Sequence, residues 1–191
     1  MWVNPDMLNN VIVRLGGFHI AKNFLGVIGK HMEKSGLSDA WIESGLYNAC
    51  TADNILEGKS WNRAVRAHKL TLEALARLLL TSFKHWQERT SKTSYVTIEA
   101  LAAEVGNCED TSGTVNREAL ENFLSNTVEF NTDQKEFQSS RESDGTFLFW
   151  RQYMEMVQLL LLFIRADRDG DWELHISTFQ AMLPYMVIYD H

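Results

Sequence analysis

The sequence predicts a mainly α-helical fold, a helical bundle with one short strand near the N-terminus. Its 191 residues contain only two prolines, and leucine, alanine, glutamate and lysine, which are good helix formers, are frequent. Apolar side chains recur at spacings of three and four residues along several segments, which is typical of amphipathic helices. Because 45% of the residues are hydrophobic, the chain has enough apolar side chains to form a core.

The first elements are the strand and a helix. Residues 10–15 hold a β-branched apolar run that a double glycine ends, which predicts a strand turning into a helix. The helix is expected over Phe18–Ser35, where Gly36 stops it. Gly26 and Gly29 lie inside it. Each costs roughly 1 kcal/mol relative to alanine, so we expect a neighbouring segment to pack closely there.

Two short helices and one long helix follow. Ser38 is a candidate N-cap for a helix that ends at Gly45, and Thr51 for one that ends at Gly58. The strongest prediction is a helix over Ser60–Glu88, because its apolar side chains form one continuous seam. The seam consists of Trp61, Val65, His68, Leu72, Leu75, Leu79, Phe83 and Trp86.

The middle of the chain is more polar. Residues 89–96 predict a linker, and Thr97 is a candidate N-cap for a helix to Val105 that Gly106 ends. Residues 106–113 predict a loop, because glycine, asparagine, aspartate, serine and threonine dominate there. A further helix is expected over Asn116–Asn126.

The C-terminal third returns to an apolar helical pattern. We expect the polar residues 131–145 to be only partly ordered, and a long apolar helix over Phe147–Arg165. A turn at Asp167–Gly170 leads to a last helix from Trp172, which Pro184 is expected to kink or break.

Composition restricts the setting and the partners. Cys50 and Cys108 show no metal or disulfide spacing, which favours a reduced compartment, nuclear or cytoplasmic. The apolar run Val157–Ile164 is shorter than the roughly 20 residues of a membrane span, so no membrane partner is expected. A net charge of −7 disfavours broad electrostatic binding of nucleic acid, although a local basic face can still bind.

An acidic turn suggests calcium, but only in part. Asp167–Asp171 places carboxylates at alternate positions, as in the first half of an EF-hand loop. Trp172 stands where that loop needs glycine, and Thr178 where it needs the closing glutamate. In the other candidate, Asp110–Val115, the acid Glu118 is out of register. We therefore expect an ordinary turn; a calcium-responsive helical protein is a third interpretation.

The histidines predict no metal site. None of the six forms a His-x-x-x-His pair or a Cys/His cluster with zinc spacing; they are His19, His31, His68, His85, His175 and His191. His68 lies on the apolar seam, so we expect a core histidine bonded to a backbone carbonyl. His19 follows the double glycine, and its simpler role is to orient the turn between strand and helix.

Four cations form a basic stripe at the start of the long helix: Lys59, Arg63, Arg66 and Lys69. They follow each other at spacings of four and three residues with no acid among them, where the helix dipole disfavours positive charge. A phosphate or an acidic partner explains the placement. The alternative is a solvated face paired with Glu57 and Glu73.

Motifs along nearly the whole chain resemble a multi-copy, transposon-derived family of animal proteins. They are Leu15-Gly16-Gly17-Phe18-His19, Phe24-Leu25-Gly26, Ser35-Gly36-Leu37, Gly58 to His68, Phe149-Trp150 with Tyr153, Phe163-Ile164-Arg165-Ala166, Gly170-Asp171-Trp172 with Leu174-His175, Met182-Leu183-Pro184 and Tyr189-Asp190. His19 and Asn23 are similar to the His-x-x-x-Asn segment of Mutator-like and hAT transposases.

The resemblance implies a partial RNase H-like α/β core with a helical insertion. Residues 1–35 would form a strand-helix piece of the core, 36–146 the insertion, and 147–191 the helices that return to the core. Such a core cuts DNA with two Mg²⁺ ions held by three convergent carboxylates. By analogy the first two acids precede Met1, so the chain is expected to be an internal fragment.

The resemblance leaves Asp167 and Glu173 as candidates for the third catalytic acid. Mg²⁺ would bind only with the missing acids present, so we expect no cofactor in this chain. The leading functional prediction is a catalytically inert transposase-like remnant that binds nucleic acid weakly through the basic stripe. The alternative is a helical protein-interaction module without a nucleic-acid role.

Overall fold

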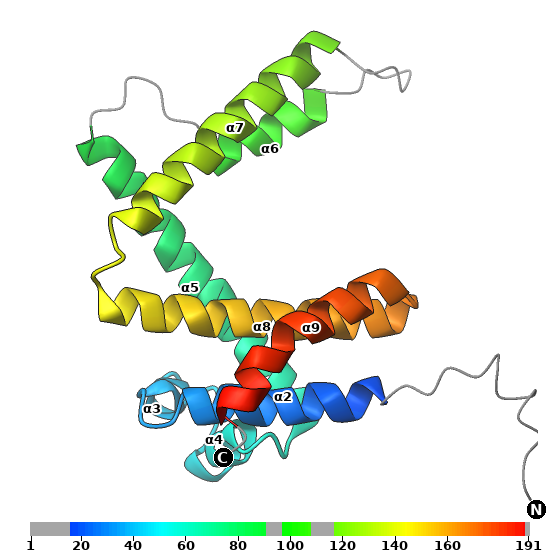
Figure 1. Cartoon of the computed structure of the whole chain (residues 1–191). Helices are drawn as coiled ribbons and strands as arrows, with labels where there is room; N and C mark the ends of the chain where they lie inside the picture. The colour runs from blue at the N-terminus through cyan, green and yellow to red at the C-terminus, as the bar shows by residue number, and fades with distance from the viewer. Residues whose placement is uncertain (1–15, 91–96, 108–116, 190–191) are drawn as a thin grey trace, which may run out of the picture. The chain divides into compact units, whose positions relative to one another are not determined.

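The computed structural model describes residues 16–90, 97–107 and 117–189, and every regular element among them is an α-helix (Figure 1). The predicted mainly helical fold is therefore confirmed. The strand predicted over residues 10–15 lies outside the described residues.

Contacts divide the chain into two compact units. The first contains the described residues up to Leu72 together with those from Gln152 onward, and the second is Glu73–Arg151. The boundaries fall inside helices α5 (Trp61–Arg89) and α8 (Gly145–Asp169). The division into a core piece over residues 1–35, an insertion over 36–146 and returning helices over 147–191 stays a prediction.

The first unit is built around helix α2 (Gly17–His31), which contacts both α4 (Ala49–Leu56) and α9 (Trp172–Tyr189). Helix α3 (Leu37–Glu43) contacts α4. The largest fully buried apolar side chains of this unit are Phe24, Leu25, Ile28, Met32, Ile55, Tyr153, Met156, Leu160, Phe163 and Met182. These come from α2, α4, α8 and α9 and the turn after α2, so residues far apart in sequence share one core.

The starts of the short helices differ from the predicted ones. Ser38 and Thr51, predicted as N-caps, both lie inside helices. Gly36, in the left-handed region at φ +83°, precedes α3, and the Asn48 side chain caps α4 by accepting a hydrogen bond from the Thr51 amide at 2.9 Å. Glycine and asparagine serve as helix ends as well as serine does, so several adjacent candidates could not be ranked by residue type.

Helix α2 ends at His31, earlier than the predicted Ser35. Lys34 and Gly36 both adopt positive φ, which no helix continues through. The close packing predicted at Gly29 is confirmed, because a methyl group there would overlap the carbonyl oxygen of Leu56. At Gly26 the neighbouring segment also packs closely, because a methyl group on Gly58 would lie 3.0 Å from the Gly26 nitrogen, although a methyl group on Gly26 itself would meet nothing within 4 Å.

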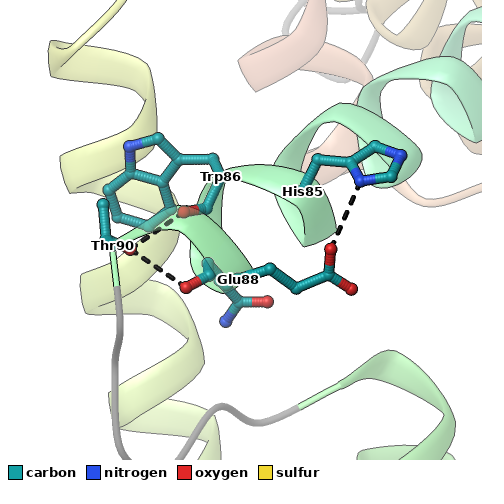
Figure 2. A network of polar contacts seen from close by, with 5 residues as sticks. His85, Trp86, Glu88 and Thr90 are labelled. Atoms are coloured by element: carbon teal, nitrogen blue, oxygen red, sulfur yellow. Dashed lines mark hydrogen bonds and ion pairs between the residues drawn. The ribbon is translucent and has the colours of Figure 1, made fainter.

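Helix α5 begins as predicted, with the Ser60 carbonyl accepting from the Ala64 amide at 2.7 Å. At its other end, in the second unit, the Thr90 hydroxyl donates to the carbonyls of Trp86 (2.9 Å) and Gln87 (3.1 Å) in the last turn (Figure 2), and the Thr90 amide also donates to the Trp86 carbonyl at 3.0 Å. Beside it, His85 Nδ1 lies 3.3 Å from Glu88 Oε2. Helix α5 therefore ends at Arg89, one residue into the linker predicted over residues 89–96.

Helices α6 (Ile98–Asn107) and α7 (Arg117–Ser139) lie side by side in the second unit (Figure 1). The Thr97 hydroxyl accepts from the Ala100 amide at 3.1 Å, so the predicted N-cap of α6 is confirmed. The predicted end of the next helix at Asn126 is wrong, since α7 continues to Ser139.

The expectation that residues 131–145 are partly ordered is also wrong. Phe137 and Asp133 are buried on α7, where Gln87 Nε2 donates to Asp133 Oδ2 at 3.0 Å. The Phe137 ring lies 5.5 Å from that of Phe83. A buried amide–carboxylate pair and one aromatic anchor hold this polar stretch in a helix, and neither produces an apolar periodicity.

The end of α8 and the start of α9 lie in the first unit. Gly170, at φ +70°, separates the two helices, and the Asp171 carboxylate caps α9 by accepting from the Leu174 amide at 2.9 Å. Pro184 does not break α9, which continues to Tyr189. Pro184 is exposed, so water can bond the carbonyl that its missing N–H leaves free.

Among the helices that the structure describes, α8 is the one that is long enough and apolar enough to cross a membrane, judged by length and composition alone. This is weak evidence, because a core helix passes the same test. Tyr153, Val157, Leu160 and Phe163 of α8 are buried in the first unit.

Candidate functional site

The basic stripe lies on the side of α5 that faces away from the core of the first unit. Arg63, Arg66 and Lys69 are exposed, as is Lys59 in the preceding loop. With 3.6 residues per turn, these positions are opposite Ala64 and the other buried residues of the same stretch, Ala67 and His68. Small alanines on the inner side let α5 lie close to its neighbours, while every long cationic side chain is left on the outer side.

The ion pairs near the basic stripe can be compared with the alternative in which Glu57 and Glu73 neutralise it. Lys59 forms an ion pair with Glu57, as that alternative expects. Glu73 instead pairs with Arg77, with Nη2 and Oε1 2.7 Å apart. Among the described residues, no carboxylate forms an ion pair with Arg63, Arg66 or Lys69. Helix α5 has no acidic residue in its first turn, so the dipole at this helix end adds to the positive potential.

His19 and Asn23 lie one turn apart on α2, and both are exposed. The His19 ring meets the Phe18 ring edge to face at 5.7 Å. Gly16, in extended backbone, is the N-cap of α2, and as a glycine it has no side chain with which to cap the helix. Asn23 borders a pocket of about 520 Å³ that Lys22 and Lys30 also line. The strand that His19 was expected to follow lies outside the described residues.

Asp167 and Glu173 have different surroundings. Asp167 is half-buried at the N-terminal end of α2, where a methyl group on Gly17 would overlap its carboxylate. Its Oδ1 lies 3.8 Å from Nδ1 of the buried His175. Glu173 is exposed in the first turn of α9. Neither joins a group of three or more histidine, cysteine, aspartate or glutamate side chains that could hold a metal, as far as the described residues extend.

The acidic turn does not have the form of a calcium loop. Asp167 and Asp169 lie inside α8, and Asp169 accepts from Arg165 Nε at 3.2 Å. Asp171 caps α9. Each of the three carboxylates thus has a separate structural partner or neighbour, which accounts for their presence without an ion.

His68 is a core histidine, but its partner differs from the expected one. Its Nδ1 lies 2.8 Å from the Tyr153 hydroxyl, and the ring is fully buried. The Trp41 ring packs on it edge to face at 5.5 Å, and Trp41 Nε1 donates to the Thr71 hydroxyl at 2.9 Å. Burial lowers the pKa of His68 to about 4 and raises that of Tyr153. No local pattern predicts this pairing, since Tyr153 is one aromatic residue among several on an apolar helix.

The profile of a domain of unknown function, DUF8702, matches residues 1–191. The chain belongs to the DUF8702 family. No curated protein matches it, and no solved structure matches it. Any function assigned to this DUF8702 domain therefore depends on its own residues, and the basic stripe is the surface feature that both sequence and structure single out.

Proposed function

We propose that the chain binds nucleic-acid phosphates weakly through Lys59, Arg63, Arg66 and Lys69. The supporting observation is their exposure on one side of α5, three of them with no ion pair to a described carboxylate. The net charge of −7 does not oppose this locally, because basic and acidic residues are nearly equal in number in the described part of the first unit. Four phosphate contacts are few, so the affinity is low. The affinity falls as salt rises, because each contact releases a counterion from the nucleic acid.

The proposal includes an origin. A transposon-derived ancestor with an RNase H-like core, including a strand over residues 10–15, accounts for the motif resemblance and for the basic surface. Two-metal cleavage needs three convergent carboxylates. Asp167 and Glu173 are not gathered into such a group among the described residues. In this proposal the chain is a catalytically inert nucleic-acid binder of the nucleus or cytoplasm.

The binding proposal predicts a specific charge-reversal effect. Arg63→Glu combined with Arg66→Glu is expected to lower the affinity for double-stranded DNA at least about tenfold at low salt. For the unsubstituted chain, four contacts predict a slope of log K against log salt near about −3.6, and the variant is expected to lose about half of it. Fluorescence anisotropy with a labelled duplex across a salt series measures both.

The control is Arg117→Glu with Lys135→Glu, which makes the same charge change at exposed positions of α7. It is expected to weaken binding by less than about threefold, through net charge alone. If both double variants bind equally well, or if neither differs from the unsubstituted chain, the stripe is not the binding surface.

A second prediction concerns catalysis. The purified chain is expected to leave supercoiled plasmid uncut in the presence of Mg²⁺, because cleavage needs two further carboxylates in reach of Asp167. Agarose electrophoresis of the plasmid after incubation measures this. Cutting that disappears in Asp167→Asn would show a working metal centre and overturn the inert part of the proposal.

A protein-interaction module remains the second candidate because of α9. Leu183, Val187 and Ile188 expose 41%, 67% and 61% of their surface on this helix, and such a group of apolar side chains is typical of contact surfaces. Absence of salt-dependent DNA binding, together with a second chain bound in light scattering, would favour this candidate.

A further inference from the structure

A small pocket of about 210 Å³ in the first unit brings together side chains from three helices. Its lining includes Phe18 of α2, Trp61 of α5 and Phe163 of α8, with Asp167 and Arg168. The Phe18 and Trp61 ring centroids are 4.9 Å apart and the rings are inclined at 59°. The pocket is therefore bordered by three aromatic rings and one carboxylate.

The arrangement does not follow from core packing alone. Phe163 is fully buried, but Phe18 leaves 51% of its surface exposed beside the pocket. Gly17 leaves room for the Asp167 carboxylate, since any side chain there would collide with it. A carboxylate thus lies against the N-terminal end of α2 and within the lining of an aromatic pocket.

The chemistry of the lining favours one class of ligand. Aromatic faces attract cations, most strongly where water is excluded, and the carboxylate adds to the attraction. An unsubstituted ammonium brings three N–H donors that need acceptors, and Asp167 is the only carboxylate among the described residues that line the pocket. A methylated ammonium has few or no such donors. Drug-sized ligands occupy pockets of about 300–1,000 Å³, so this smaller one suits a head group or the tip of a side chain.

We propose that this pocket binds a methylated ammonium cation, such as the head of trimethyllysine or of choline. Phe18 and Trp61 contact the methyl groups, and Asp167 balances the charge. Arg168 is exposed and borders the same pocket, so its positive charge limits the affinity. The proposal is independent of DNA binding, because the basic stripe contributes no residue to this pocket.

Titration of the full chain with trimethyllysine, choline and lysine, followed by calorimetry and the indole N–H signal of Trp61, tests the proposal. Trimethyllysine is expected to bind at least about fivefold more tightly than lysine. Choline binding as tightly as trimethyllysine would identify the head group alone as the ligand. Tighter binding of trimethyllysine would identify a modified side chain.

Three variants make the test decisive. Phe18→Ala, at a half-exposed position where the fold is expected to persist, should weaken binding at least about fivefold, whereas Phe149→Ala in the second unit should not change it. Arg168→Ala should tighten binding of the cation and would weaken that of an anion. Equal affinities for lysine and trimethyllysine, no binding of either, or an unchanged affinity in Phe18→Ala would overturn the proposal.

Discussion

Gly29→Ala is expected to destabilise the first unit by about 3 kcal/mol, the upper part of the range for overpacked sites. The added methyl group would overlap the Leu56 carbonyl. A backbone atom cannot rotate away as a side chain can, so α2 and α4 must separate. Urea unfolding followed by circular dichroism measures the change in the free energy of unfolding.

The matched control lies on the same helix, one turn earlier. Gly26→Ala meets nothing within 4 Å, so it is expected to stabilise the fold by up to about 1 kcal/mol through helix propensity. The two substitutions add the same atom to the same helix and are expected to have opposite signs. Equal effects of the two would show that α4 does not lie against Gly29.

The second large effect is a loss of stability in mild acid. His68 has a pKa of about 4 in the fold, against 6.5 when unperturbed. Between these values the unfolded chain binds the proton and the folded chain does not, so the free energy of unfolding rises with pH. The stability contributed by a neutral His68 is complete above pH 6.5 and is lost as the pH falls to 4. The difference of 2.5 pH units corresponds to on the order of 3 kcal/mol.

His68→Leu isolates this contribution. It removes the titrating ring, while Tyr153 keeps its hydrogen bond with the Thr71 side chain. The free energy of unfolding, measured by urea titration at intervals from pH 7 to pH 4, is expected to fall less steeply in this variant. His85→Leu, at an exposed position of the same helix, should keep the slope of the unsubstituted chain. Parallel curves for all three proteins would exclude His68 as the source.

The sequence predicted helices well where their ends carry a distinctive residue and their faces are apolar. Helix α5 begins after Ser60, and α6 begins after Thr97, whose hydroxyl accepts from the Ala100 amide as the capping rule predicts. Prediction failed for α7, because Asp133 is buried by pairing with Gln87, 46 residues away. A contact of that range leaves no periodic signal. The buried face of α5 also differs from the predicted seam. Ala64 and Ala67 are buried, whereas larger seam residues such as Trp61 and Val65 are only half-buried.

The two candidate sites differ in the same way, because one depends on local sequence and the other on contacts between distant residues. The basic stripe could be predicted because its spacing and its sign of charge are local properties of one helix. The pocket of Phe18, Trp61 and Asp167 could not, because its members come from three helices and Asp167 lies 149 residues after Phe18 in the chain (167 − 18). Phe18 fits the apolar side of α2, and Trp61 fits the seam of α5. Each was therefore assigned to a core, and only the packing of the helices shows that both border a pocket.

The interrupted first unit has a consequence for synthesis in the cell. Its core needs Tyr153, Leu160 and Met182, yet the residues up to Leu72 leave the ribosome before all of them. At a translation rate of about 5–20 residues per second, the intervening stretch takes on the order of ten seconds. During that time Phe24 and Ile28 lack these packing partners and are accessible to chaperones. The second unit is one uninterrupted segment of the chain, so it can complete its folding before the last residues of the first unit have been synthesised.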